Sequence, residues 1–209
     1  MKRILLFFAS IFTYAVIATN PHIENSRVNS ESSTIKWVGS KISSSHEGYI
    51  KISKGFLSIN HGSLVGGQFV IDMNSITCTD IKSEGKNKYF VEHLKDDDFF
   101  NVKEFPQSKI KIVKVTPVDD KENLYDIVAS LTIKGITNPI SFQSKISING
   151  SSFLAEAKII IDRTKWDIRY GSGTFFDNLG DKMILDENEK IQFKQKVITF
   201  LNNESAKWD

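Results

Sequence analysis

The chain has 209 residues, of which 40% are hydrophobic and 25% are charged, a composition typical of one globular domain with its own core. Its formal net charge is +2, and Lys2 and Arg3 account for it: residues 1–18 contain no acid, so 25 basic and 25 acidic residues remain in the rest of the chain. This balance, without a cluster of Lys or Arg, argues against a nucleic acid or an anionic membrane surface as a partner.

Residues 1–18 have the pattern of a secretory signal peptide: a basic start, an apolar stretch from Ile4 to Ala18, and small residues at its end. The apolar stretch is 15 residues long. A membrane-spanning helix needs roughly 20, so we expect cleavage rather than stable membrane insertion. The expected location is therefore the periplasm or the cell exterior. Residues 19–32 are polar and lack periodicity, which predicts a flexible lead-in, and we expect residues 202–209 to form a C-terminal tail.

From residue 33 onward, apolar and polar residues mostly alternate, which is the period of half-buried β-strands. The alternation predicts about eight antiparallel strands within one domain, residues 33–201. The apolar positions that define them are, in chain order, Ile35 and Trp37; Ile50 and Ile52; Leu57 and Ile59; Phe69, Ile71 and Met73; Ile110 and Ile112; Tyr125, Ile127, Ala129, Leu131 and Ile133; Ile140, Phe142, Ile146 and Ile148; Phe153, Ala155, Ala157, Ile159 and Ile161; and Ile191, Phe193 and Val197.

Turn and break signals separate these strands. Residues 60–62 (Asn-His-Gly) and 149–150 (Asn-Gly) predict hairpin turns, because Asn and Gly tolerate positive φ angles. Residues 54–55 (Lys-Gly) predict a break between two strands. The apolar phase shifts between Ile112 and Val113, which predicts either a β-bulge near Ile112 or a strand end that is buried on both faces.

The segment from Glu84 to Lys95 departs from the alternation. Its apolar residues recur near helical spacing with charged residues between them, which predicts one amphipathic helix that ends before three aspartates, residues 96–98. The apolar positions are Tyr89, Phe90, Val91 and Leu94. About eight antiparallel strands, each with one apolar face, must pack as a sandwich or close into a barrel. With one helix in the order, the sequence favours an all-β antiparallel barrel whose end is capped by the helix.

The interior of such a barrel is either a packed core or a ligand cavity. Ala129, Ala155 and Ala157 occupy inward positions where Leu or Ile would fill more space, and Met73 adds an adaptable apolar wall. These small residues leave volume for an apolar ligand, or they make room for aromatic side chains from across the barrel. The residues alone leave both interpretations open.

A further stretch, Ile159–Asp181, combines turn-forming glycines with aromatic residues, as a rim or plug at the end of a barrel requires. Together with three earlier stretches it closely resembles the YceI-like family of secreted bacterial lipid-binding proteins. The earlier stretches, in order, are Gly66–Met73 (Gly-Gly-Gln-Phe-Val-Ile-Asp-Met), His93–Phe100 (His-Leu-Lys-Asp-Asp-Asp-Phe-Phe) and Leu131–Ile140 (Leu-Thr-Ile-Lys-Gly-Ile-Thr-Asn-Pro-Ile). The resemblance covers roughly residues 33–200.

The resemblance implies a lipocalin-like barrel that holds a long isoprenoid chain, such as a polyprenyl lipid or a quinone tail, in an apolar tunnel. It implies a carrier without catalytic residues, metal or cofactor, whose binding is almost entirely hydrophobic. The tunnel residues to which it points are Trp37, Ile50, Phe69, Ile71, Met73, Phe90, Leu94, Phe99, Phe100, Leu131, Phe142, Ala155, Ala157, Ile159 and Trp166. An exposed strand edge or rim aromatic leaves room for a homodimer.

No pattern typical of an enzyme or a metal site stands out. The four histidines, His22, His46, His61 and His93, lack metal-ligand spacing among themselves, and the aspartates do not follow an EF-hand order. His46 contacts a ligand headgroup in one interpretation and satisfies a loop carbonyl in the other. The single cysteine, Cys78, has no partner for an intrachain disulfide, and we interpret it as structural because nothing near it in the sequence would activate its thiol.

Asp162, Arg163 and Arg169 flank Trp166 in the last stretch, where they either pin a rim loop or face a polar headgroup; we favour pinning. Two other classes of function stand beside the carrier. An interaction module would have a filled core and no bound lipid, and an enzyme acting on a buried lipid would need a titratable pair facing the cavity. The inward faces of the predicted strands carry almost no titratable residue, so the carrier is the leading hypothesis.

Overall fold

A computed structural model describes residues 22–41, 44–149, 152–169 and 191–199 of the chain. The strands are β1 (Ile23–Arg27), β2 (Ser33–Lys41), β3 (Ser44–Asn60), β4 (Ser63–Asp72), β5 (Gln107–Pro117), β6 (Leu124–Ile133), β7 (Ile136–Asn149), β8 (Ser152–Ile161) and β9 (Ile191–Thr199). One α-helix, α1 (Glu84–Lys95), and two short 3₁₀ helices, η1 (Met73–Ser75) and η2 (Arg163–Trp166), complete the elements of these ranges.

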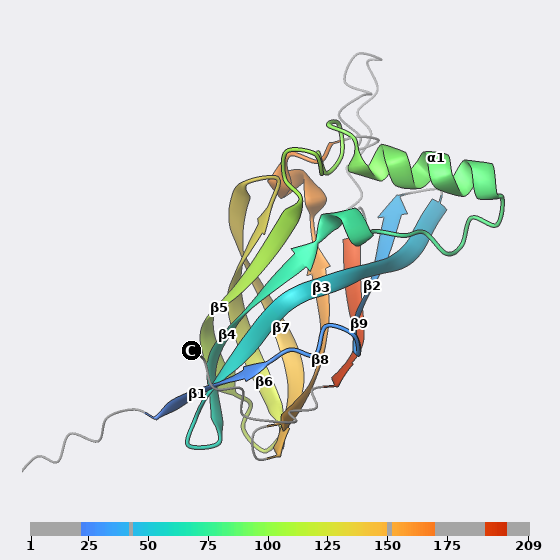
Figure 1. Cartoon of the computed structure of the whole chain (residues 1–209). Coiled ribbons are helices and arrows are strands. Elements are labelled where there is room, and N and C mark those ends of the chain that lie inside the picture. The colour runs from blue at the N-terminus through green and yellow to red at the C-terminus, as the bar shows by residue number, and fades with distance from the viewer. Residues whose placement is uncertain (1–21, 42–43, 150–151, 170–190, 200–209) are drawn as a thin grey trace, which may run out of the picture.

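The strands form one antiparallel sheet that closes on itself. Its order is β1-β3-β2-β9-β8-β7-β6-β5-β4, and β3 also pairs with β4, so β2 to β9 make a continuous ring. Figure 1 shows α1 lying across one end of this ring. The predicted all-β barrel with one capping helix is therefore confirmed. A closed barrel removes the unpaired strand edges that an open sheet would expose.

Alternation along the strands builds the interior. In β6, Ile127, Ala129, Leu131 and Ile133 are buried while Asp126 and Val128 are exposed. Most buried apolar residues of the strands, together with Leu94 of α1 and Trp166 of η2, belong to one apolar cluster. Each buried Ile or Leu stabilises the fold by roughly 1.5–3 kcal/mol, so a core is sufficient without a disulfide.

Strand β3 is continuous where the sequence predicted a break at residues 54–55. The register of its pairing with β4 shifts between Ile52 and Lys54, and after the shift the buried positions change from even to odd numbers. Gly55 lies so close to β4 that a Cβ would approach Phe69 Cδ1 at 2.7 Å. The prediction of a break was wrong because a bulge bends the strand and exchanges its faces without ending it.

The predicted bulge in β5 is confirmed. The register between β5 and β6 shifts between Ile112 and Lys114, and Val113 is 64% exposed while Ile112 is buried. The predicted hairpin turn between β3 and β4 is confirmed as well, since His61 (φ 48°) and Gly62 (φ 78°) both have the positive φ of a type I′ turn. Strands β7 and β8 pair as a hairpin up to Asn149, and the turn residues 150–151 lie outside the described ranges.

Helix α1 begins and ends where its apolar spacing predicted. Leu94 is buried, and Phe90 and Val91 pack against the core. Tyr89, predicted on the same apolar face, is 78% exposed, because the turn of the helix places its side chain on the solvent side. The helix ends at Lys95, and the next residue, Asp96, has an extended backbone.

The predicted flexible lead-in, residues 19–32, contains a strand. Residues 23–27 form β1, which pairs with the C-terminal part of β3, whereas β2 pairs with its N-terminal part. The sequence did not predict this strand because its mostly polar side chains show no alternation of apolar residues. The strand is held by backbone pairing with a distant part of the chain. The signal-like residues 1–18, the whole glycine-rich stretch after Arg169, and the tail 202–209 lie outside the described ranges.

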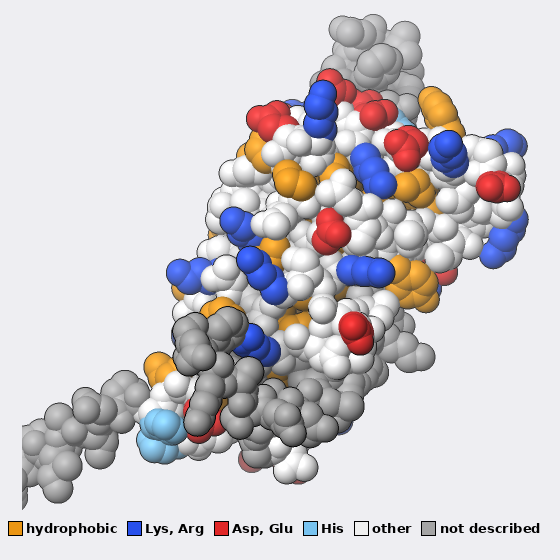
Figure 2. Space-filling view, viewed as in Figure 1, with side chains coloured by type: hydrophobic (Ala, Val, Ile, Leu, Met, Phe, Trp, Pro, Cys, Tyr) orange, Lys and Arg blue, Asp and Glu red, His pale blue; other side chains and the backbone are white. Residues whose placement is uncertain are grey.

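The visible surface carries both signs of charge. Figure 2 shows Lys and Arg side chains interspersed with Asp and Glu over the described part of this face. This distribution agrees with the balanced composition. No helix within the described ranges has the length and the apolar character required to span a membrane.

Candidate functional site

An apolar cavity of about 50 Å³ lies inside the barrel. Side chains from every strand from β2 to β8 surround it. The lining residues are Ile35, Ile52, Leu57, Phe69, Ile71, Ile110, Ile112, Ile127, Phe142, Ser144, Ile146, Ala155, Glu156, Ala157 and Ile159. We call this space the barrel cavity.

Cross-strand pairing brings these side chains together. Ile127 of β6 pairs with Phe142 of β7, and Ile146 of β7 pairs with Ala155 of β8. Opposite residues in a sheet have Cβ atoms about 4.5–5.5 Å apart, so each pair forms one continuous patch of the wall. Ala155 presents only a methyl group beside Ile146, and this small side chain leaves part of the cavity volume unfilled.

The few polar groups of the barrel cavity lie in its wall near β8. Ser144 is buried on the inward face of β7, and its hydroxyl donates to the Glu156 carbonyl oxygen at 2.9 Å. The register between β8 and β9 shifts between Ala155 and Lys158, which interrupts the regular ladder beside the cavity. Among the described lining residues, Glu156 is the one ionisable side chain. The described wall of the cavity is therefore mainly apolar.

All fifteen residues predicted to line the tunnel lie in the apolar interior or pack against it. Six of them border the barrel cavity: Phe69, Ile71, Phe142, Ala155, Ala157 and Ile159. The other nine lie elsewhere in the core or, in the case of Phe90 and Phe99, pack against it: Trp37, Ile50, Met73, Phe90, Leu94, Phe99, Phe100, Leu131 and Trp166. The structure thus separates the predicted set into cavity wall and packed core.

Two tryptophans anchor the packed core. Trp166 is 1% exposed and its indole N–H donates to the Leu131 carbonyl oxygen at 3.0 Å. The indole N–H of Trp37 donates to the Thr77 carbonyl oxygen at 3.0 Å. A buried indole fixed by a hydrogen bond is a rigid filler, so these residues close the interior instead of lining open space.

Arg163 has the pinning position that the sequence analysis favoured. It is buried, its Nη1 donates to the Ile168 carbonyl oxygen at 3.1 Å, and its guanidinium lies 5.5 Å from the centre of the Phe99 ring. Asp162 caps η2 by accepting from the Thr164 N–H at 3.0 Å. These contacts hold the η2 loop against the core.

Most cavity residues outside the predicted tunnel set were visible in the sequence as inward strand positions. Ile35, Ile52 and Ile110 share the apolar phase of their strands. What the sequence did not reveal was which inward positions meet at one level of the barrel. Ser144 was missed because a serine interrupts the apolar phase, although its even number between Phe142 and Ile146 placed it on the inward face.

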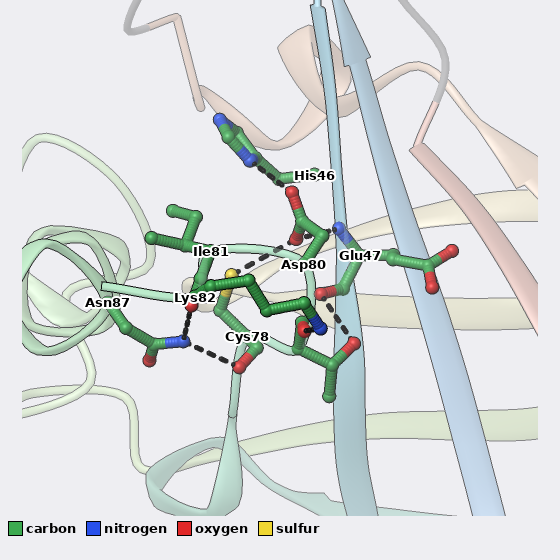
Figure 3. Close-up of polar contacts among 8 residues, drawn as sticks. His46, Glu47, Cys78, Asp80, Ile81, Lys82 and Asn87 are labelled. Atoms are coloured by element: carbon green, nitrogen blue, oxygen red, sulfur yellow. Dashed lines mark hydrogen bonds and ion pairs between the residues drawn. The ribbon is translucent and has the colours of Figure 1, made fainter. Parts of the chain in front are cut away.

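A polar cluster lies at the helix end of the barrel, formed by His46, Cys78 and Asp80 (Figure 3). We call it the rim cluster. His46 Nδ1 lies 2.8 Å from Asp80 Oδ2, and the Cys78 thiol donates to Asp80 Oδ1 at 3.2 Å. The Glu47 N–H also donates to Asp80 Oδ1, at 2.9 Å. The ring of His46 packs on Phe90 of α1, with centroids 4.5 Å apart.

The surroundings shift the pKa of Asp80 and the pKa of Cys78 in opposite directions. Burial raises the pKa of Asp80, but hydrogen bonds from the Glu47 N–H, His46 and Cys78 outweigh it and hold that pKa at about 2. Burial raises the pKa of the Cys78 thiol, so the thiol is not an activated nucleophile. The sequence does not reveal this cluster, because 31 intervening residues separate His46 from Cys78.

Comparison with protein families matches residues 27–194 to the YceI-like domain. Among curated proteins, a UPF0312 protein of Yersinia pestis (strain Pestoides F) is 32% identical over 60 residues, which is 29% of this chain and 30% of that protein. A UPF0312 protein of Yersinia enterocolitica is 34% identical over 62 residues, with the same two shares. The chain thus matches less than a third of the length of these relatives.

Two solved structures share the fold. Burkholderia cenocepacia BcnA has a TM-score of 0.62 at 20% identity, with 81% of this chain and 98% of that chain covered. A polyisoprenoid binding domain from Saccharophagus degradans, implicated in plant cell wall breakdown, has a TM-score of 0.56 at 14% identity, with 84% and 99% covered. At these identities the likeness concerns the architecture alone.

Proposed function

The chain belongs to the YceI-like domain family, and on that premise we propose that its barrel binds a long isoprenoid lipid, a polyprenyl chain or a quinone tail, without catalysing a reaction. The polyisoprenoid binding domain from Saccharophagus degradans, which has the same architecture, supports this ligand class. The signal-like residues 1–18 support a periplasmic or secreted location for the carrier.

The observation that carries the proposal is the apolar character of the barrel cavity. Its wall is built mainly from Ile, Phe and Ala side chains, and its buried Ser144 hydroxyl is already bonded to a backbone carbonyl. A hydrocarbon chain gains roughly 0.8 kcal/mol for each CH₂ that it buries. Such a wall selects a ligand by the length and branching of its chain and only weakly by its headgroup.

The size of the cavity sets a condition on binding. A volume of about 50 Å³ is far below the roughly 300–1,000 Å³ of typical ligand pockets, so the interior must open to admit an isoprenoid chain. Phe69 and Phe142 are half-buried wall residues. We expect rotation of these two rings to provide the space, because their side chains are the largest in the cavity wall.

The same small volume favours a second candidate, an interaction module with a filled core. In that case the residues of the barrel cavity serve stability alone, and the outer surface contacts a protein partner. Ala155 would then accommodate neighbouring side chains instead of a ligand. The two candidates differ in one measurable property, which is the presence of a bound lipid.

Native mass spectrometry of the full-length protein produced in a bacterial host, followed by organic extraction, separates the candidates. For the carrier we expect a discrete mass excess that leaves with the extract as a polyprenyl compound. An apo protein that takes up no added polyprenyl lipid or quinone would contradict the carrier and support the filled-core module.

A further inference from the structure

The loop that follows η1 runs antiparallel beside β3 and is joined to it by two backbone hydrogen bonds. The Thr77 N–H donates to the Tyr49 carbonyl oxygen at 2.9 Å, and the Thr79 N–H donates to the Glu47 carbonyl oxygen at 2.8 Å. Successive side chains on a strand point to opposite faces. The loop residues that alternate with Thr77 and Thr79 therefore direct their side chains to the opposite face.

This register gathers three metal-binding side chains on one face. Cys78 lies opposite Gly48, and Asp80 lies opposite His46. Gly48 permits the close approach, because a Cβ at this position would be only 1.8 Å from the Thr77 carbonyl oxygen. Because Gly48 has no side chain, Cys78 can lie beside the other two donors.

The donor atoms already converge. One ligand atom from each of His46, Cys78 and Asp80 lies within 4.8 Å of the other two. Ligand atoms of a tetrahedral zinc site, with bonds of about 2.0–2.3 Å, are themselves roughly 3–4 Å apart. Two separations already lie near this range, His46 Nδ1 to Asp80 Oδ2 at 2.8 Å and Cys78 Sγ to Asp80 Oδ1 at 3.2 Å.

The surroundings hold the donors in place. Asn87 of α1 donates through Nδ2 to the carbonyl oxygens of Cys78 and Ile81, both at 2.9 Å (Figure 3). The Glu47 N–H fixes one carboxylate oxygen of Asp80, and the second oxygen faces His46. Outer contacts of this kind orient ligands in metal sites.

We propose that the rim cluster binds one Zn²⁺ ion through a ring nitrogen of His46, the thiolate of Cys78 and a carboxylate oxygen of Asp80. Water completes a tetrahedral coordination, since His46 and Asp80 are each about a third exposed at the side chain. The mixed nitrogen, sulfur and oxygen donors suit a zinc-class ion and not Mg²⁺ or Ca²⁺, which take oxygen ligands.

The binding step balances in charge and atoms. The Cys78 S–H bond breaks as the Zn–S bond forms, and its proton passes to solvent; no electron is transferred. One thiolate and one carboxylate neutralise the two positive charges of Zn²⁺. The ion ties β3 to the loop after η1, independently of whether the barrel cavity holds a lipid.

Co²⁺ substitution tests the proposal directly. The full-length protein contains a single cysteine, so a sulfur-to-cobalt charge-transfer band can come only from Cys78. We titrate the reduced protein with CoCl₂ and with ZnCl₂, and we expect this band together with one Zn²⁺ per chain. Loss of an outer contact, which only orients a ligand, costs metal sites about 10–100-fold in affinity. Cys78 and Asp80 are direct ligands, so Cys78→Ser and Asp80→Asn should each weaken zinc binding by at least about 10-fold.

Asp98→Asn is the matched control, because Asp98 also faces a histidine, His93, at 3.7 Å but has no thiol beside it among the described residues. We expect this variant to bind zinc as the unmodified protein does. Absence of the charge-transfer band would overturn the proposal, as would zinc binding that Cys78→Ser and Asp80→Asn leave unchanged. If either variant fails to fold by circular dichroism, the cobalt spectrum of the unmodified protein decides by itself.

Discussion

Gly48 determines how closely the loop after η1 approaches the barrel. A Cβ at this position would meet the Thr77 carbonyl oxygen at 1.8 Å and Trp37 Cζ2 at 2.9 Å. The same carbonyl oxygen accepts the indole hydrogen bond of Trp37. One glycine therefore permits both the loop pairing and the anchoring of a buried tryptophan.

We predict that Gly48→Ala destabilises the protein by about 1–3 kcal/mol, since the added methyl group overpacks a site that cannot yield without losing the Trp37 hydrogen bond. Urea unfolding measures the change. Gly66→Ala is the control, because its Cβ would meet its nearest neighbour, Ser58 Cβ, at an ordinary 3.8 Å. Equal free energies of unfolding for the two variants would contradict the predicted clash.

Asp80 predicts a pH dependence of stability in metal-free protein. Its folded-state pKa of about 2 lies below the ordinary 3.8, so its contribution is complete above about pH 4 and is lost as the pH falls through 2. We expect Asp80→Asn to cost about 1 kcal/mol or less at neutral pH, because the carboxylate is partly exposed. With a chelator present, the difference in free energy of unfolding from the unmodified protein should shrink between pH 4 and pH 2; a constant difference would contradict this assignment.

At the scale of elements, bulges decide which residues face inward. The shift in β3 between Ile52 and Lys54 allows both Ile52 and Leu57 to reach the barrel cavity although their numbers differ in parity. Without it, one half of this long strand would turn its apolar side chains to solvent. The bulge in β5 at Val113 has the same effect on its strand.

Helix α1 contributes to stability through one side of its surface. We predict that Leu94→Ala costs about 2–5 kcal/mol, because it removes a buried side chain from the core cluster. Tyr89→Ala, on the same helix but 78% exposed, should change stability by no more than about 0.5 kcal/mol. Thermal or urea unfolding compares the two; similar losses would show that α1 does not cap the barrel in the way described.

At the scale of the whole molecule, closure of the sheet creates an interior that is divided between packed core and cavity. Trp37 and Trp166 fill part of it, while Ala155 and Ala157 keep part of it open. The balance between these regions determines how much the barrel must expand for a ligand. The space in the interior therefore depends on a few small residues more than on the many large ones.

We predict that Ala155→Phe or Ala157→Phe abolishes uptake of polyprenyl lipid while the barrel still folds, at a cost of about 1–3 kcal/mol from overpacking. Leu154→Phe is the control, because Leu154 lies on the outer face of the same strand and is 37% exposed. Lipid uptake is followed by native mass spectrometry and folding by circular dichroism. Unchanged uptake in both cavity variants would remove the ligand from this part of the barrel.

Features that depend on neighbouring residues could be predicted from the sequence. Helical spacing located α1 from Glu84 to Lys95, a phase shift located the bulge near Ile112, and residues 60–62 identified a hairpin turn. Strand alternation also placed Ile127, Ala129, Leu131 and Ile133 of β6 on its buried face. These predictions succeed because short-range periodicity and turn chemistry are local properties of the chain.

The roles of the inward residues depend on how the strands are arranged in the closed barrel. The sequence did not distinguish Phe69 in the cavity wall from Trp166 in the packed core, because that difference depends on which strands meet at one level of a closed barrel. Nor did it connect His46 with Cys78 and Asp80, which are brought together by the register of a loop against β3. Long-range register follows from the packing of the whole ring, and no single stretch of sequence contains it.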